Sequence, residues 1–347
     1  MASTSPLYMI SFREAQKILQ QNARSFGTEK ITLEAADGRV LAEQIRADRD
    51  YPPFNRATMD GYALDGADLR SGIRRFEIIE TVYAGAAATL PFRPGACYKI
   101  MTGAPVPPDV DMIIRREDTL EGEQDMEISG SGATRPFLNI ARQGEDMQTG
   151  QTIIDGPCRC TPSIIGLLAS LGKEELMVQR LPRLALVTTG NEVVPVGAVL
   201  SPVQIRNSNR WLLQSFLKRW QIIPAFYEHA PDDKTQLKAI IKNALQNDVV
   251  LLCGGVSAGD ADHVPDVLNE AGVQCLFHKL AIKPGKPVWC GITEKGGVVI
   301  ALPGNPFSCL TGFVLLIEPW LRACFGLPAE AIKGLPLATT KKKKNTP

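Results

Sequence analysis

Residues 249–257 read Val-Val-Leu-Leu-Cys-Gly-Gly-Val-Ser, five apolar residues that run directly into a pair of glycines. A short apolar run closed by glycine is typical of a strand buried on both faces of a sheet. Helical patterns lie on either side of it, over residues 233–245 and 263–271. A buried strand between two helices predicts a βαβ arrangement, and therefore a parallel sheet with right-handed connections.

The same alternation of strands and helices extends along the C-terminal half of the chain. Further strands are predicted at 184–188, 222–227, 273–277, 288–291 and 298–302, and further helices at 207–220 and 305–324. We therefore predict a three-layer α/β domain with a mostly parallel sheet over residues 181–328.

The N-terminal half has a different pattern. Ser11-Phe12-Arg13-Glu14 is a capping box that predicts a helix near the start, and residues 31–45 contain a second helical-looking piece. Thr161-Pro162 predicts a helix that ends at Gly172, with threonine as the N-cap. Between these segments, glycine and proline are dense and the apolar runs are short, at 76–82, 96–100 and 112–114. This pattern indicates a β-rich lobe with long loops.

These patterns separate a β-rich lobe, the α/β domain and a tail, with helical segments on either side of the lobe. We assign residues 49–132 to the lobe. The tail, residues 329–347, contains four consecutive lysines and is predicted to be a flexible, solvated end.

Composition excludes several classes of protein. Of the 347 residues, 44% are hydrophobic and 22% are charged, which is close to the globular average and excludes wholesale disorder. The net charge of +1 argues against a broad nucleic-acid-binding surface. Eight cysteines without a Cys-x-x-Cys pair, and three histidines without ligand spacing, argue against a zinc site. The scattered cysteines are interpreted as small buried apolar residues in a reducing compartment.

No membrane or secretory segment is predicted. The first ten residues lack a basic region followed by a long apolar run, so they are not a secretory signal. The longest apolar run near the C-terminus is interrupted by Glu318 and is shorter than the ~20 residues that a bilayer requires. We therefore expect a cytoplasmic protein.

Two glycine-containing turns follow predicted strands of the α/β domain. Gly254 and Gly255, with Ser257 two residues further on, lie between a strand and a helix, and Pro303-Gly304-Asn305-Pro306, followed by Ser308, occupies the same kind of junction. Each turn alone is explained equally well by a tight connection or by an oxyanion-binding loop. Because both junctions lie at the carboxyl edge of the sheet, the pair favours a shared anion pocket.

Charged residues accompany these turns. Lys283 and Lys286 lie in the proline-rich turn Lys-Pro-Gly-Lys-Pro, which would be an ordinary surface turn if it stood alone. Glu192 follows the first strand of the domain, Asp232-Asp233 precedes a helix, and Asp260 and Asp262 follow the glycine pair. Asp233 also fits a simple helix N-cap. Carboxylates beside phosphate-binding turns suggest a hydrated Mg²⁺ site.

Seven segments, taken together and in order, resemble a known family. They are Pro-Pro-Phe-Asn-Arg-Ala-Thr-Met-Asp-Gly-Tyr-Ala at 52–63, Ile-Met-Thr-Gly-Ala-Pro-Val-Pro at 100–107, Gly-Glu-Asp at 144–146, Thr-Thr-Gly-Asn-Glu at 188–192, Cys-Gly-Gly-Val-Ser-Ala-Gly-Asp-Ala-Asp at 253–262, Lys-Pro-Gly-Lys-Pro at 283–287 and Leu-Pro-Gly-Asn-Pro at 302–306. Over residues 8–328 this order resembles the MoeA-type molybdopterin molybdenumtransferases, which include the gephyrin E domain.

The resemblance implies that the β-rich lobe is inserted into a segmented N-terminal domain, residues 1–48 and 133–180, and that the α/β domain binds molybdopterin. It also implies an activity in molybdenum cofactor biosynthesis. Members of the family take adenylylated molybdopterin and molybdate, require Mg²⁺, release AMP and leave molybdenum on the pterin dithiolene. The family works as a homodimer whose composite active site lies between the α/β domain of one subunit and the β-rich lobe of the other. A molybdopterin adenylyltransferase and molybdoenzyme chaperones are the further partners that this implies.

The resemblance also implies roles for individual residues. Those that match the family's functional positions as catalytic groups are Asp60, Thr102, Asp146, Glu192, Asp232 and Asp262, with Glu192 and Asp262 as the metal or water-orienting groups. Those that match the cradle for the pterin phosphate are Gly254, Gly255, Ser257, Pro303, Gly304, Asn305 and Pro306, with Lys283, Lys286 and Ser308 as candidates for binding molybdate or phosphate.

The chain also departs from the family pattern. Thr58 stands where alanine is common, and Arg116 precedes an acidic pair where the family is less basic. The family commonly continues into a small C-terminal β-barrel, for which the residues after Leu327 are too few. A non-catalytic molybdopterin carrier or regulatory paralogue is therefore the alternative. The related adenylyltransferase shares only the α/β domain, and the N-terminal lobe argues against it.

Overall fold

The computed structural model describes residues 7–130, 135–256 and 263–328. The chain divides into two compact units. One comprises residues 1–43, 156–169 and 173–347, and the other comprises residues 44–155 and 170–172. The second unit is therefore almost entirely an insertion into the first.

A seven-stranded sheet forms the centre of the first unit. Its spatial order is β1 (Leu7–Ile10), β21 (Gln274–Leu280), β22 (Trp289–Ile292), β23 (Val298–Leu302), β20 (Val249–Cys253), β16 (Leu184–Thr189) and β19 (Phe226–Ala230). Only β22 pairs antiparallel with its neighbours. All residues of β16, β20 and β23 are buried, as expected for strands covered on both faces. The prediction of a three-layer domain with a mostly parallel sheet is confirmed.

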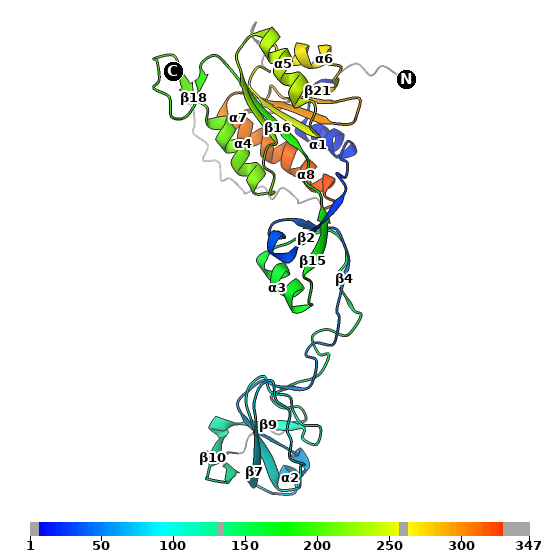
Figure 1. Ribbon diagram of the computed structural model, residues 1–347, viewed down its shortest axis with the longest axis vertical. Coiled ribbons are helices and arrows are strands. Elements are labelled where there is room, and N and C mark those ends of the chain that lie inside the picture. Colours follow the sequence, from blue (N-terminus) through cyan, green and yellow to red (C-terminus); the bar gives the residue numbers. More distant parts are fainter. Residues whose placement is uncertain (1–6, 131–134, 257–262, 329–347) are drawn as a thin grey trace, which may run out of the picture. The chain divides into compact units, whose positions relative to one another are not determined.

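Helices cover both faces of this sheet (Figure 1). The helices α1 (Phe12–Gln21), α4 (Ser208–Lys218), α7 (Pro306–Gly312) and α8 (Glu318–Cys324) pack on one face. The helices α5 (Lys234–Ala244) and α6 (Val264–Glu270) pack on the other. Side-chain oxygens begin most of them, because the first N–H groups of a helix have no partner within it. Ser11 accepts from Glu14 N at the start of α1, which confirms the predicted capping box.

The predicted helical piece within residues 31–45 is wrong. The structure has β2 (Thr28–Thr32), a single 3₁₀ turn (Leu33–Ala35), β3 (Val40–Leu41) and β4 (Ile45–Arg46) there. β2 and β3 belong to a four-stranded sheet, whose order is β14 (Cys158–Arg159), β3, β15 (Glu175–Gln179) and β2. Pairing with residues more than 100 positions away therefore overrides the local pattern. The predicted helix after Thr161 is confirmed as α3 (Pro162–Ser170).

Two predicted boundaries also shift. The strand predicted at 222–227 is β19, which begins only at Phe226 because Pro224 has no N–H to donate to a ladder. The predicted closing helix is continuous but contains a π-helical turn, Phe313–Ile317, between α7 and α8. Pro319 cannot donate to the carbonyl of Leu315, and Gln16 Nε2 donates to that carbonyl instead, at 2.6 Å.

The closing helix also bears on the prediction that no segment spans a membrane. Among the described residues, only the stretch Pro306–Cys324 is long and apolar enough to cross a bilayer, with a mean hydropathy of 1.3 over its most apolar window. Because the helix continues through the π turn into α8, this stretch is longer than the run interrupted at Glu318 suggests. Half of that window is buried inside the domain, and core helices of globular proteins pass the same test, so length and composition alone are weak evidence for a span.

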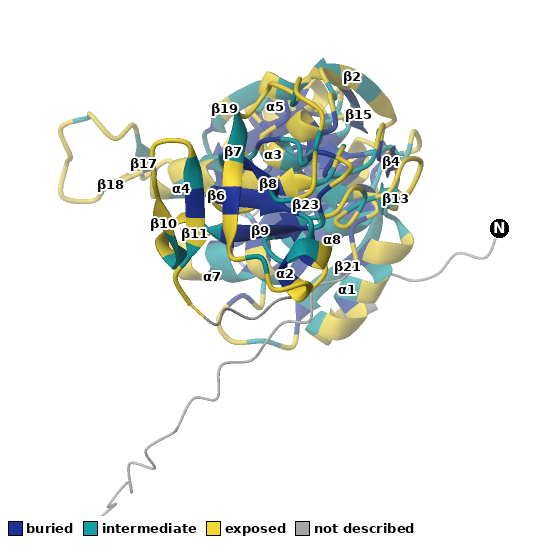
Figure 2. Ribbon diagram, turned by 90° about the horizontal axis from the view of Figure 1, so that it is seen from below, coloured by how far each residue is buried: buried dark blue, intermediate teal, exposed yellow. Residues whose placement is uncertain are grey.

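The second unit is built on a six-stranded sheet. Its order is β10 (Thr119–Glu121), β11 (Asp125–Ile128), β7 (Arg75–Val82), β8 (Ala96–Ile100), β6 (Gly61–Leu64) and β9 (Met112–Arg115). The predicted strands at 76–82, 96–100 and 112–114 are confirmed. Two short pairs, β5 (Arg56–Ala57) with β12 (Ile140–Ala141) and β4 with β13 (Thr152–Ile154), and the helix α2 (Gly66–Arg70) complete it. The strands β6, β8 and β9 are largely buried (Figure 2).

Candidate functional site

A cavity of about 630 Å³ lies at the carboxyl ends of β16, β20 and β23. This is the edge of a parallel sheet at which ligands bind in open α/β folds. The cavity is lined by the loops that follow the strands, including the loop after β19, and by the N-terminal ends of α4 and α7. The short pair β17 (Val193–Val194) and β18 (Ile205–Arg206) and the residue Pro287 complete the lining. The lining residues are Thr188, Thr189, Gly190, Glu192, Val193, Ile205, Arg206, Asn207, Ser208, Asn209, Asp232, Cys253, Gly254, Gly255, Val256, Pro287, Pro303, Gly304, Asn305, Pro306 and Ser308.

The glycine pair after β20 is required by the backbone. Gly254 and Gly255 have φ angles of +101° and +67°, which L-residues with side chains rarely adopt. A Cβ on Gly254 would lie 2.4 Å from Thr189 Oγ1. The N–H of Gly254 donates to the carbonyl of Leu302 at 3.0 Å, which links the two predicted turns. The tight-turn interpretation therefore holds, and both glycines also line the cavity.

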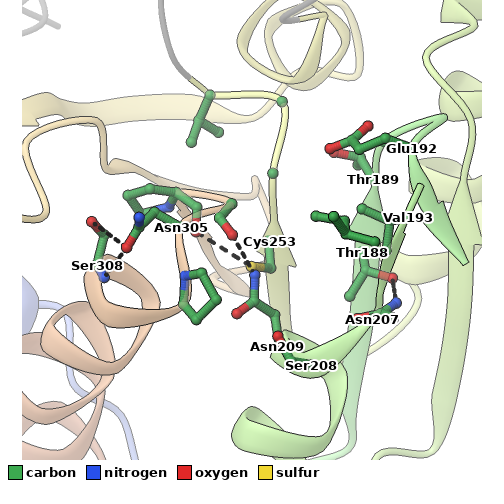
Figure 3. Close-up of a pocket in the computed structure, with 18 of the residues that line it drawn as sticks. Thr188, Thr189, Glu192, Val193, Asn207, Ser208, Asn209, Cys253, Asn305 and Ser308 are labelled. Atoms are coloured by element: carbon green, nitrogen blue, oxygen red, sulfur yellow. Dashed lines mark hydrogen bonds between the residues drawn. The ribbon is translucent and has the colours of Figure 1, made fainter. Parts of the chain in front are cut away.

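The turn after β23 begins the closing helix at the opposite wall. Asn305 is the N-cap, and its Oδ1 accepts from the N–H groups of Phe307 and Ser308 at 3.0 and 3.2 Å. Asn209 Nδ2, from the first turn of α4, donates to the carbonyl of Gly304 at 2.6 Å. Figure 3 shows Asn305 and Ser308 on one side of the cavity and Thr189 and Glu192 on the other. The two helix N-termini are thereby held around one space.

Two of the predicted carboxylates line this cavity. Glu192 follows β16, and Asp232 follows β19. Asp232 Oδ2 accepts from the N–H of Asn191 at 3.0 Å, and Asn191 Oδ1 accepts from the N–H of Asp232 at 3.1 Å, so the two loops brace each other. Asp233 is the N-cap of α5, as the simpler interpretation of the sequence has it.

The remaining predicted residues of this domain lie elsewhere. Ser257, Asp260 and Asp262 fall outside the described residues. Lys283 and Lys286 are exposed and do not line the cavity, although the adjacent Pro287 does. Within the described ranges, no three histidine, cysteine, aspartate or glutamate side chains form a group that could hold a metal.

The predicted residues of the lobe lie in the second unit. Asp60 Oδ1 accepts from the N–H and the hydroxyl of Thr102, at 2.7 and 2.6 Å. The side-chain bond from Thr102, followed by its backbone bond, lowers the pKa of Asp60. Asp146 is exposed in a loop, and its N–H donates to the carbonyl of Tyr51 at 2.9 Å. Thr102 thus holds the Asp60 carboxylate in its charged form, and Asp146 makes no contact with this pair among the hydrogen bonds of the described residues.

Sequence reasoning predicted the helix at 207–220 but did not assign it to the site, where its start forms the third wall. Asn207, Ser208 and Asn209 begin α4 and line the cavity, together with Thr188 and Arg206. The Asn-Ser-Asn sequence ahead of an apolar helical pattern was the available signal, because such residues cap helices. The pattern identifies a helix start and does not say which strand end it faces.

Cys253, which the sequence interpretation treated as a small buried residue, lies at the floor of the cavity. Its Sγ lies 3.7 Å from Cys309 Sγ and 3.4 Å from the carbonyl oxygen of Pro303. The contact with Cys309 and burial raise the pKa of Cys253 well above its ordinary value. All eight cysteines are free thiols.

Comparisons with known proteins cover nearly the whole chain. Residues 10–172 match the family described as "MoeA N-terminal region (domain I and II)", and residues 185–323 match the "Probable molybdopterin binding domain". A molybdopterin molybdenumtransferase from Synechocystis is 34% identical over 305 residues, which cover 87% of this chain and 78% of the relative. One from Synechococcus elongatus is 36% identical over 91% of this chain and 80% of the relative.

The fold agrees with solved structures as well. A molybdopterin biosynthesis moeA protein from Pyrococcus horikoshii superposes with a TM-score of 0.77 at 28% identity, covering 92% of this chain and 80% of that one. Sequence and fold therefore lead to the same conclusion: this chain belongs to the MoeA family of molybdopterin molybdenumtransferases.

Proposed function

We propose that this protein inserts molybdenum from molybdate into adenylylated molybdopterin and releases AMP. One observation carries the proposal: a single cavity combines a cradle suited to an oxyanion with two carboxylates, Glu192 and Asp232. The substrate is a phosphoanhydride, so its hydrolysis needs both kinds of group. The volume of about 630 Å³ lies within the range of small-molecule sites, roughly 300–1,000 Å³.

The cradle is built around helix N-termini more than around cationic side chains. The N-terminal turns of α4 and of the closing helix, with the Gly254-Gly255 turn, face the cavity. A helix N-terminus carries about half a positive charge and stabilises an anion by roughly 0.3–1 kcal/mol. Among the lining residues that the structure describes, only Arg206 adds a formal positive charge. We propose that these groups bind the phosphate of the pterin.

Glu192 and Asp232 are the candidates for orienting water and for binding Mg²⁺. Mg²⁺ takes oxygen donors, and it is commonly held by one or two carboxylates with substrate phosphates and waters. Both side chains supply such oxygens beside the phosphate cradle, so the residues present fit the ion. When bound, Mg²⁺ offsets the negative charge of the phosphoanhydride. The carboxylates would accept hydrogen bonds from the attacking water and hold it in line.

Asp60 and Thr102 are proposed to act from the lobe of a second copy of the chain. Both side chains are exposed, and Thr102 keeps Asp60 in its charged form. An exposed carboxylate fixed by two hydrogen bonds is suited to meet a ligand held by another surface. The proposed site is therefore complete only in a homodimer.

The test is AMP release from adenylylated molybdopterin in the presence of molybdate and Mg²⁺. We expect Glu192→Gln and Asp232→Asn to lower kcat by about 100-fold, the order typical of lost acid–base or electrostatic groups. Asp233→Asn is the matched control, since asparagine also caps helices well and Asp233 does not line the cavity. Tight molybdopterin binding without turnover would favour a carrier, and formation of adenylylated product from ATP would favour an adenylyltransferase.

A further inference from the structure

We propose that His229 is a positioning residue that holds the loop carrying Glu192 in place, through a directed chain of hydrogen bonds. His229 lies on β19, directly opposite Thr188 on β16 in the parallel register. Asn207, the N-cap of α4, completes the chain of side chains. The inference rests on the proposed function, because its effect is expected to reach the reaction through Glu192.

The contacts form an unbroken series from α4 to the loop. Asn207 Nδ2 lies 2.8 Å from Thr188 Oγ1, and Thr188 Oγ1 lies 2.9 Å from His229 Nδ1. His229 Nε2 lies 3.0 Å from the carbonyl oxygen of Gly190. Figure 3 shows Asn207 and Thr188 joined at the wall of the cavity. Every step is short enough for an ordinary hydrogen bond.

The direction of each bond follows from the chemistry of its two ends. A carbonyl oxygen only accepts, so His229 Nε2 carries a proton and donates to Gly190. The Nδ1 of a neutral ring is then an acceptor, and the Thr188 hydroxyl donates to it. The same hydroxyl oxygen accepts from the amide of Asn207. Asn207 Oδ1 is used in turn, since it accepts from the N–H of Arg210.

The series of hydrogen bonds ends at Gly190, where the backbone conformation is restricted. Gly190 has a φ angle of +126°, and a Cβ there would lie 2.7 Å from Glu192 Oε2. The Glu192 carboxylate therefore lies against the main chain of Gly190. The carbonyl of Gly190 also accepts from the N–H of Val193 at 3.2 Å, so it anchors the turn on both sides of Glu192.

The two loops of the cavity are thus fixed at different points. Asp232 binds the N–H of Asn191, and His229 binds the carbonyl of Gly190. Loss of the His229 bond would leave the peptide that follows Gly190 held by two hydrogen bonds, from the N–H of Val193 to its carbonyl and from its N–H to Asp232, so that its orientation is less restricted. Displacement of a catalytic group by ~1 Å can cost about 100-fold in rate.

Two substitutions at His229 separate the loss of its hydrogen bond to Gly190 from the loss of the ring itself. His229→Asn places an amide near the Thr188 hydroxyl and cannot reach Gly190, whereas His229→Gln presents a donor at the position of Nε2. We expect His229→Asn to lower kcat by about 10- to 100-fold with little change in KM. His229→Gln should restore most of the loss. Tyr227→Phe is the control, because the Tyr227 hydroxyl contacts Thr188 and Asn207 only at 3.4 and 3.3 Å, off the path to Gly190.

A double-mutant cycle tests whether the effect passes through Glu192. In a Glu192→Gln background, His229→Asn should add little further loss, because the group it positions is already gone. If the fold-losses in kcat of the two single variants multiply in the double variant, the proposal is overturned. Equal kcat for His229→Asn and wild type, with Glu192→Gln inactive, would overturn it while leaving the proposed function intact. An active Glu192→Gln would instead count against the proposed function.

The ring of His229 gives a readout that is independent of activity. The chain has only three histidines, so ¹⁵N spectra of the imidazole nitrogens are simple to assign with a His229→Gln reference. We expect a ring that carries a proton on Nε2 in the folded protein. A ring protonated on Nδ1 alone cannot donate to Gly190, and that result would reject the proposal even if a variant failed to fold.

Discussion

Thr102 controls the ionisation of Asp60 through two hydrogen bonds to one carboxylate oxygen. The pKa of Asp60 is lowered from the ordinary 3.8, with the Thr102 side chain as the main cause. Because the folded-state pKa is depressed, the stabilisation is present above the unfolded-state pKa and is lost as the pH falls through the folded-state value. We expect Thr102→Val to raise the pKa of Asp60, and Thr102→Ser to keep it low. An NMR titration of the Asp60 carboxyl checks this, and identical midpoints in both variants would contradict it.

Gly254 is expected to tolerate no side chain. Its φ is +101°, and a Cβ would meet Thr189 Oγ1 at 2.4 Å. Gly254→Ala should therefore lower the free energy of unfolding by about 1–3 kcal/mol, the cost of a strained backbone position. Gly304→Ala is the matched control, since its Cβ would meet only Gly254 Cα, at 3.8 Å. Urea unfolding measures both, and equal stability of the two variants would show that the turn can relax.

At the scale of elements, the π turn of the closing helix depends on a residue far away in the sequence. Gln16 Nε2, on α1, donates to the carbonyl of Leu315 at 2.6 Å, where Pro319 has no N–H to offer. Gln16→Ala should lower the free energy of unfolding by roughly 1–2 kcal/mol, since it leaves a partly buried carbonyl without this donor. Gln20→Ala, at an exposed position of the same helix, should change little. Denaturant titration of the two variants separates this effect from helix propensity, which is the same for both.

Elements also differ in how far the sequence could predict them. The strands at 184–188, 249–253 and 298–302 were predicted well, because both faces of each are buried and the apolar run is continuous. The strand β1 was not predicted at all, since its only partner is β21, more than 260 residues later. Residues 31–45 were misassigned for the same reason. Short strands are determined by their partners, and these partners are distant.

At the scale of the whole molecule, the cysteines should behave as core residues. Burial raises the pKa of Cys97 to about 12 and that of Cys160 to about 11. Six of the eight are buried, and Cys158 and Cys275 are half-buried. We expect slow and incomplete reaction with a thiol reagent in the native state, and eight thiols after unfolding in guanidinium. Fewer than eight in the unfolded protein would mean that some cysteines are paired, contrary to the structure.

The candidate site shows the same division between local and distant information. The turns at 254–255 and 303–306 and the carboxylates Glu192 and Asp232 were predicted, and all of them line one cavity. These features depend on neighbouring residues in the sequence: positive φ angles, a capped helix start and a position just after a strand. The two lysines of the proline-rich turn were predicted in the same way, and they lie outside that cavity.

By itself, then, the sequence determined the α/β class, the two glycine-containing turns and the family, because each depends on neighbouring residues or on motif order. Only the tertiary structure decided that α4 forms a wall of the cavity and that Asn207, Thr188 and His229 lie in one chain of hydrogen bonds. Asn207 and His229 follow Thr188 by 19 and 41 positions, and parallel strand register with helix packing brings the three side chains together. Which groups meet depends on contacts between distant segments, and no local pattern records them.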